Sequence, residues 1–250
     1  IPDKVAVYPI SEDADSKNKT YLSLSYVTGN IEDTETNLAL GMLSDLLTGN
    51  DNAPLKKALK DKGIAEDFYA SFNMNGLQPT FTINAVNSEE SSKEAFKETI
   101  LNTLDNISKN GFDENYLEST LQSYEISKRS EKLITPMLGG NGIILSQAAL
   151  STWVYDKDPT MYFDTSSVAD KINKSDINKY FQDLISKCLL SNNYHSLVVL
   201  KPEAGLESKN SKNADSKLAA YKSQIGENGI TSLMQETENF NNWQKSEDSK

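Results

Sequence analysis

Hydrophobic and polar residues alternate with a period of two in several short runs of the chain, and this pattern predicts β-strands. Residues 5–8 and 21–27 are also expected to be strands, the second because of its aliphatic and aromatic content, and a polar, acidic loop separates them. The clearest signal lies between Phe68 and Val86, where two alternating runs flank Asn75-Gly76, a dipeptide suited to a hairpin turn with positive φ. We therefore expect a β-hairpin in which Gly76→Val costs about 1 kcal/mol or more, because a β-branched side chain is strained at positive φ.

Elsewhere apolar residues recur every three or four positions, which predicts amphipathic helices. Asp33 or Thr34 can cap a first helix that ends at Gly49, and a second extends from Pro54 to Lys62. Between residues 91 and 191 we expect several more helices. Their apolar stripes are Phe96, Ile100, Leu104 and Ile107; Tyr116, Leu117, Thr120, Leu121 and Tyr124; and Ile177, Phe181, Leu184 and Cys188. A further run from Ile143 to Val154, after a glycine-rich turn at 139–142, is expected to be buried.

The order of these elements predicts the fold class. Strands come first, helices follow, and residues 195–200 return as a strand that Pro202 is expected to close. This order is typical of a two-layer α+β unit, with a mostly antiparallel sheet covered on one face by helices. We assign this unit to residues 1–204.

The last part of the chain has a different pattern. Residues 203–216 are polar and interleave Lys, Ser and Asn, which is typical of a linker. Two apolar stripes follow, and a break from Gly226 to Gly229 separates them. Residues 205–250 are therefore expected to be a linker followed by a helical hairpin.

Composition and charge exclude several classes of function. Hydrophobic residues make up 37% and charged residues 24% of the 250 residues, which is typical of a globular protein. The net charge of -11 repels a phosphate backbone, so we expect no nucleic-acid partner. We also expect no membrane partner, because no apolar run approaches the roughly 20 residues that span a bilayer. The single cysteine, Cys188, favours a reducing compartment, and we expect a cytoplasmic protein.

The residues that carry most enzyme chemistry are scarce. A zinc hydrolase needs about three protein ligands, usually with at least two His or Cys, and this chain has one of each. His195 directly precedes an alternating strand, so it is interpreted as a strand-end histidine, and Cys188 lies on an apolar helical stripe and is interpreted as a core residue. Asp13 and Asp15 lack the turn glycine and the terminal glutamate of a calcium loop, so they are interpreted as solvated charges. Glu89 and Glu90 lie at an expected helix start, where the helix dipole favours negative charge. The sequence therefore predicts no catalytic residue and no metal ligand, and it identifies no substrate-binding residue.

Several segments resemble the second domain of presequence proteases, a branch of the pitrilysin/insulinase superfamily of zinc peptidases. The resemblance extends over nearly the whole chain in order and spacing. The segments that carry it are 21–29, 43–47, 52–59, 63–65, 153–159, the strand from His195 into Lys201-Pro202-Glu203, and 230–249. The last of these is similar to the end of the helical hairpin that joins the two halves of these enzymes.

This resemblance implies a unit built on the plan of the zinc-bearing domain but without the metal. In the family, two halves enclose a chamber that degrades short unstructured peptides, and the zinc motif belongs to the first domain. The expected cofactor, zinc, is thus bound outside this chain. The expected partners are the remaining domains of the same polypeptide and the peptide substrates of the parent enzyme.

Two functions of different classes remain open at this point. The first is an internal, non-catalytic segment of a zinc metalloendopeptidase that contributes to the chamber wall and the hinge. The second is a stand-alone structural or interaction module with the same fold and no peptidase activity. The start at Ile1-Pro2-Asp3, without Met, favours the first. A zinc-binding helix encoded upstream of Ile1 would decide between them.

Overall fold

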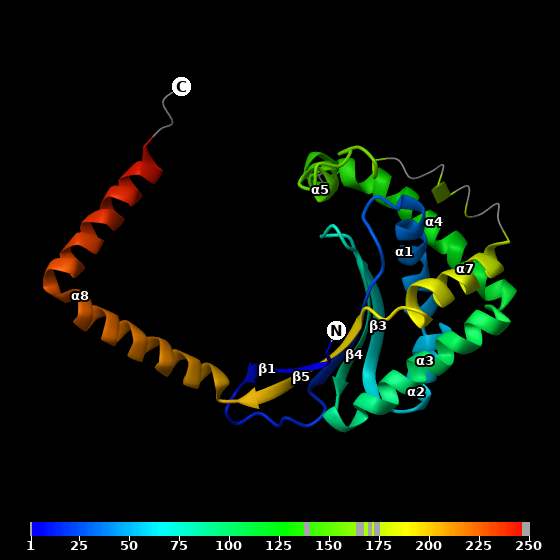
Figure 1. Ribbon diagram of the computed structural model, residues 1–250, viewed down its shortest axis with the longest axis horizontal. Coiled ribbons are helices and arrows are strands. Elements are labelled where there is room, and N and C mark those ends of the chain that lie inside the picture. The colour runs from blue at the N-terminus through cyan, green and yellow to red at the C-terminus, as the bar shows by residue number, and fades with distance from the viewer. Residues whose placement is uncertain (1, 138–140, 164–167, 170–171, 173–175, 247–250) are drawn as a thin grey trace. The chain divides into compact units, whose positions relative to one another are not determined.

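The structure is a computed structural model that describes residues 2–137, 141–163, 168–169, 172 and 176–246 (Figure 1). It divides into two compact units. The sheet unit comprises residues 1–7 and 16–202, and the α8 unit comprises residues 8–15 and 203–250. The expected domain division at residue 204 remains a prediction.

A five-stranded sheet with the order β1-β5-β2-β4-β3 forms the framework of the fold. Its strands are β1 (Lys4–Ile10), β2 (Thr20–Val27), β3 (Ala65–Asn73), β4 (Thr80–Ser88) and β5 (His195–Ala204). β2 pairs antiparallel with β4 and β5, and β3 pairs antiparallel with β4. β1 runs parallel to β5, because Pro2 contacts Ser196 at one end and Ile10 contacts Gly205 at the other. The sheet is therefore mixed and mostly antiparallel.

The alternation in the sequence places apolar side chains on one face of this sheet. In the central row, Leu24 of β2 lies opposite Ile83 of β4 and Leu197 of β5, and all three side chains are fully buried. The other face of the same strands is polar. There the Ser23 hydroxyl donates to Asn84 Oδ1 at 2.6 Å, and the hydroxyls of Ser25 and Thr82 lie 3.0 Å apart. A shift of one residue would reverse the two faces, so this pattern fixes the register.

Helices cover the apolar face. The helices of the sheet unit are α1 (Thr34–Thr48), α2 (Pro54–Asp61), α3 (Lys93–Asn110), α4 (Glu114–Met137), α5 (Asn141–Trp153) and α7 (Ile177–Ile185), with a short 3-10 turn at Glu90–Ser92 and a π-helical turn at Ser186–Leu190. α1 packs on β3 and α3 packs on β2, so helices of the sheet unit form a second layer (Figure 1). The predicted α+β fold with helices on one face of the sheet is confirmed.

The hairpin formed by β3 and β4 is confirmed, but its predicted turn is wrong. Pairing stops at Asn73 and Thr80, so residues 74–79 form a longer loop. Gly76 does not have positive φ, and a Cβ added there would meet only the Gln78 carbonyl oxygen at 3.8 Å. The expected cost of Gly76→Val therefore loses its physical reason. Tertiary hydrogen bonds shape this loop instead, because the Ile31 amide donates to the Leu77 carbonyl at 2.9 Å.

The predicted end of the last strand at Pro202 is also wrong, since β5 continues to Ala204. Pro202 has no amide hydrogen to donate, but the pairing of β5 with β2 already stops at Leu200, opposite Tyr21. Beyond that pair one edge of β5 has no β2 partner, which is where a sheet tolerates proline.

The expectation that residues 143–154 are buried is wrong. α5 covers most of this run, yet Ile143 is 68% exposed and Trp153 is 63% exposed. Thr152 faces inward instead, and its hydroxyl donates to the carbonyls of Ala149 and Asp158 at 3.1 and 2.8 Å. The glycine-rich turn expected to precede α5 lies partly outside the described residues, and Asn141 and Gly142 begin the helix.

The α8 unit contains a helix where a linker was expected. α8 extends from Leu206 to Lys245, so most of the polar stretch at 203–216 is helical. The break predicted at Gly226 to Gly229 is present as a kink at Gly226, where φ is 63° and ψ is -175°. A positive φ of this kind is readily adopted only by glycine. No residue of α8 is buried.

Candidate functional site

Several polar side chains form hydrogen bonds at the start of α1. Asp33 caps the helix, because its side chain accepts a hydrogen bond from the Thr36 amide at 3.1 Å. One turn further along, Asn37 is only 2% exposed although its side chain is polar. Its side-chain amide donates to the carbonyls of Asn30 and Ile31 at 3.0 and 3.2 Å. Asn37 therefore fixes the loop that leads from β2 into α1.

Tyr162 approaches this loop from a distant part of the chain. Its hydroxyl accepts a hydrogen bond from Asn37 Nδ2 at 2.8 Å and donates to the Ile31 carbonyl. Burial raises the pKa of Tyr162, and the hydrogen bond from Asn37 partly opposes this shift. Asn37 Oδ1 is buried without a protein partner, which costs about 1–3 kcal/mol unless a water molecule fills the site.

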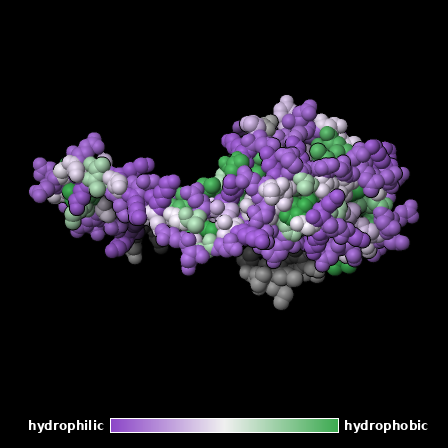
Figure 2. Space-filling view, turned by 90° about the horizontal axis from the view of Figure 1, so that it is seen from below, coloured by the Kyte–Doolittle hydropathy of each residue, from purple (hydrophilic) through white to green (hydrophobic). Residues whose placement is uncertain are grey.

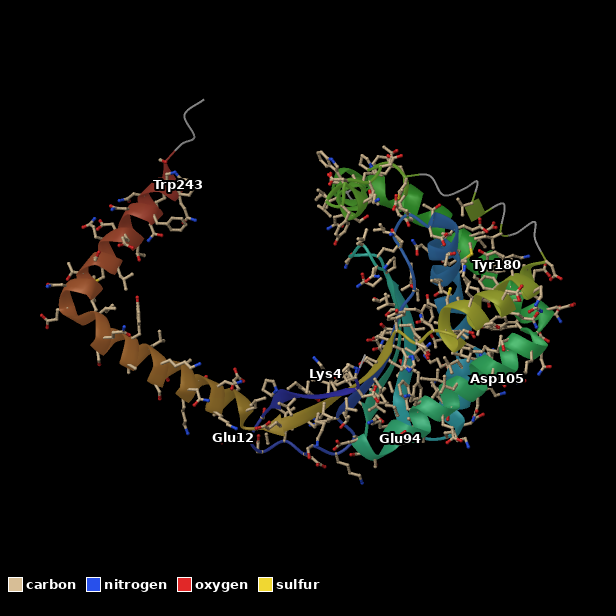
Figure 3. All side chains as sticks on the ribbon, in the orientation of Figure 1. Lys4, Glu12, Glu94, Asp105, Tyr180 and Trp243 are labelled. Carbon is tan, nitrogen blue, oxygen red and sulfur yellow. The ribbon has the colours of Figure 1, made fainter. Side chains whose placement is uncertain are left out.

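A second tyrosine lies near the same helix end. The Tyr180 hydroxyl on α7 lies 3.5 Å from Glu35 Oε1, and burial together with the nearby Glu35 charge raises the Tyr180 pKa to about 12 (Figure 3). Both tyrosine hydroxyls contact the start of α1 or the loop before it, so they stabilise this helix end. They bring no nucleophile to a base, and we interpret the region as a structural junction.

A polar hollow of about 280 Å³ opens between the end of α1 and the middle of α4. Its lining includes Asp45, Asn50 and a row of serine and threonine hydroxyls on α4. The Ser123 hydroxyl donates to the Ser119 carbonyl at 2.9 Å, which is a bond within the helix. The hollow is open to solvent and contains no His or Cys.

The single His and the single Cys belong to different elements, and neither lines this hollow. The His195 ring lies at the start of β5, with Nδ1 2.9 Å from the Asn192 carbonyl and its centroid 5.5 Å from that of Tyr26. Cys188 is buried in the core, and burial raises the pKa of its thiol. The predictions of a strand-end histidine and a core cysteine are confirmed.

The acidic candidates have structural surroundings. Asp13 and Asp15 are exposed in the loop after β1. Glu89 accepts a hydrogen bond from the Asn18 amide, and Glu90 pairs with Lys201 at 2.7 Å beside the helix start. Within the part of the chain that the structure describes, no three His, Cys, Asp or Glu side chains come together as metal ligands. One histidine and one cysteine on separate elements do not fit a zinc site.

The exposed apolar side chains form the remaining candidate surface. Hydrophilic residues cover most of the face seen in Figure 2. On α8, Leu218 and Tyr221 precede the kink, whereas Met234, Phe240 and Trp243 follow it, and all five are at least half exposed. Phe240 and Trp243 stack with ring centroids 5.8 Å apart. Surfaces of this kind mark contacts between proteins or domains. No described helix is long and apolar enough to cross a membrane.

Sequence reasoning missed Asn37 and Tyr162. Asn37 shares helical spacing with Leu40, Leu43 and Leu47, which are all fully buried, so a polar residue on that stripe is the one local signal. The partner of Asn37 could not be found from sequence, because Tyr162 lies 125 residues further along the chain.

Comparisons with known proteins connect this fold to a family. Residues 2–124 match the family described as the peptidase M16 inactive domain. The protein HypA of Clostridium perfringens is 32% identical over 243 residues, which are 97% of this chain and 25% of HypA. Presequence protease 1 of Arabidopsis thaliana is 27% identical over 240 residues, which are 94% of this chain and 22% of that protein. The chain thus spans about a quarter of the length of these relatives.

Solved structures share the fold at low identity. A protease from Helicobacter pylori has a TM-score of 0.57 and 14% identity, and the match covers 80% of this chain and 44% of that one. An inactive peptidase domain from Bordetella parapertussis has a TM-score of 0.58 and 13% identity, with coverage of 77% and 95%. At such identities the likeness shows the fold alone.

Proposed function

We propose that the chain is an internal, non-catalytic segment of a zinc metalloendopeptidase, and the match of residues 2–124 to the peptidase M16 inactive domain supports this proposal. In the longer polypeptide it forms part of the wall and the hinge of a chamber that degrades short unstructured peptides. The observation that carries this proposal is the match of 97% of the chain to one quarter of a longer relative.

The properties of the chain itself support a role in shape and not in bond chemistry. The buried row of Leu24, Ile83 and Leu197 gives a rigid sheet, and the single His and Cys have structural surroundings. The metal-activated water that cleaves peptides would come from another domain of the parent enzyme. Gly226 is the candidate hinge, because its positive φ interrupts α8. The division into residues 1–204 and 205–250 is part of this proposal.

Peptide cleavage by two forms of the protein tests the proposal. We expect the longer polypeptide to cleave an unstructured fluorogenic peptide in a chelator-sensitive manner, whereas residues 1–250 alone cleave none and bind no stoichiometric zinc. About one tightly held zinc per isolated chain would contradict the second expectation. A zinc-loaded longer polypeptide without peptidase activity would favour the stand-alone module instead.

A glycine substitution tests the hinge separately. Gly226→Ala in the longer polypeptide should lower turnover, because alanine is strained at the observed φ of 63°. Gly142→Ala is the matched control, since a Cβ there meets nothing within 4 Å. Equal turnover in both variants would remove Gly226 as the hinge and leave the wall proposal intact.

We also propose a cytoplasmic location, supported by the single cysteine, which is free and buried. Fractionation of cells that express the longer polypeptide tests this. Recovery of the protein from an oxidising compartment would contradict it.

A further inference from the structure

Four Asn-Gly dipeptides occur in the chain, at Asn75, Asn110, Asn141 and Asn228. This dipeptide can lose ammonia without an enzyme, because glycine has no side chain to hinder attack by its backbone nitrogen on the asparagine Cγ. The reaction requires the backbone to rotate until these two atoms meet. Whether each dipeptide reacts therefore depends on how firmly the structure holds its backbone.

Helices hold three of the four dipeptides. Asn110 ends α3, where its Nδ2 donates to Asn106 Oδ1 at 2.6 Å and the Gly111 amide donates to the Ile107 carbonyl at 2.8 Å. Asn141 opens α5, and Asn228 lies within α8, where only Gly226 departs from helical dihedral angles. Helical angles keep the next amide nitrogen directed along the helix axis and away from Cγ.

Asn75 has none of these constraints. It is exposed in the loop at 74–79, which belongs to neither strand of the hairpin. Its own amide donates to Asn73 Oδ1 at 2.7 Å. This bond involves neither the Asn75 side chain nor the Gly76 nitrogen, which are the two groups that react. The space around Gly76 is open, since an added Cβ would meet one atom at 3.8 Å.

We propose that Asn75 is a site of spontaneous deamidation. The Gly76 backbone nitrogen loses its proton and attacks Asn75 Cγ, so a carbon–nitrogen bond forms. The bond between Cγ and the side-chain nitrogen breaks, and that nitrogen leaves with a proton as ammonia. Water then adds to one of the two carbonyl carbons of the resulting succinimide. Ring opening gives either aspartate or isoaspartate, each with one new negative charge.

The modified loop would be anchored differently. The carbonyls of Leu77 and Pro79 accept hydrogen bonds from Ile31 and Thr28, both at 2.9 Å. Isoaspartate at position 75 lengthens the main chain by one carbon immediately before Gly76, two residues before the anchored Leu77. We therefore expect isoaspartate to weaken the connection between the hairpin loop and the start of α1, and aspartate to disturb it less.

The test is peptide mapping by mass spectrometry after incubation of the folded chain at mildly alkaline pH in ¹⁸O-water. Asn75 should convert at least about tenfold faster than Asn110 and Asn228, because those sites must first open a helix. In concentrated urea the rates at the four sites should converge. Gly76→Val should slow the reaction at Asn75 while leaving the denaturation midpoint unchanged, since the position has room for the side chain.

Two results would overturn the proposal. One is conversion of Asn110 or Asn228 as fast as Asn75 in the folded chain. The other is conversion of Asn75 in urea but not in the folded chain, because this would show that the loop protects the residue. The Asn75→Asp variant, which carries the charge from the start, identifies the aspartate product in the maps.

Discussion

Helices α3 and α8 have the same kind of apolar spacing and opposite environments. In α3, Phe96, Ile100 and Leu104 are fully buried against the rest of the sheet unit. In α8, Leu218 is 64% exposed and Met234 is 69% exposed. Helical spacing therefore specifies which face of a helix prefers burial, but it does not specify the partner that buries that face.

The difference has an energetic consequence. A helix gains little from its own hydrogen bonds in water, and most of its stability comes from packing an apolar face. α3 obtains that packing within the sheet unit, but the residues of α8 have none of it. If the chain is a segment of a longer polypeptide, as proposed above, another part of that polypeptide would bury the apolar stripes of α8.

The largest expected effect comes from removing a core side chain. Phe81 is fully buried near the start of β4, so Phe81→Ala should reduce the free energy of unfolding by about 3–5 kcal/mol. The matched change in α8, Phe240→Ala, removes a side chain that is 54% exposed and should have little effect on the isolated chain. Urea denaturation of both variants measures the difference. Similar losses would show that α8 is packed as firmly as the core.

The next effect is a loss of stability at high pH. Burial raises the pKa of Tyr26 to about 12, whereas a phenol in the unfolded chain ionises near 10. The buried, neutral phenol therefore contributes about 2–3 kcal/mol to the free energy of unfolding. Because its pKa is raised, this contribution is complete below about pH 10 and is lost as the pH rises through about 12. Tyr26→Phe should flatten the decline in the free energy of unfolding over this range. Tyr221→Phe, on α8, is the control, and an equal flattening by both variants would contradict the assignment to Tyr26.

Sequence predicted the elements of the sheet unit because their causes are local. The alternation of Phe81, Ile83 and Ala85 and the capping residue Asp33 act within a few residues, and the structure has both as expected. The turn at Gly76 was missed because distant contacts shape it. Ile31 and Thr28 hold the loop from more than forty residues away, and no local pattern contains them.

The candidate site was less accessible from sequence. The lack of a full set of zinc ligands could be inferred from sequence, because the chain has only one His and one Cys. The junction of Asn37 with Tyr162 could not, because it depends on the path of the whole chain between them. The same limit applies to α5, where an apolar composition predicted burial although Ile143 and Trp153 are exposed.

Loss of a helix cap should have a smaller effect. Asp33→Ala removes the acceptor for the Thr36 amide at the start of α1 and should cost about 1 kcal/mol. Asp215→Ala removes an exposed carboxylate inside α8, and we expect a change within about 0.5 kcal/mol. Thermal or urea denaturation of the two variants gives both values. A cost for Asp33→Ala as small as that for Asp215→Ala would show that another group satisfies the Thr36 amide.

The smallest expected effect concerns Trp243 in the isolated chain, and it becomes informative only beside the same change in the longer polypeptide. Trp243 is 69% exposed, and its stacking on Phe240 is a contact between neighbours on one helix, worth about 0.2–0.5 kcal/mol. Trp243→Ala should therefore barely move the denaturation midpoint of residues 1–250. If α8 docks onto another domain, the same change in the longer polypeptide removes a buried aromatic anchor and should cost about 2 kcal/mol or more. Equal, small costs in both proteins would show that the stripe after the kink remains solvated, and the inferred docking of α8 would then be wrong.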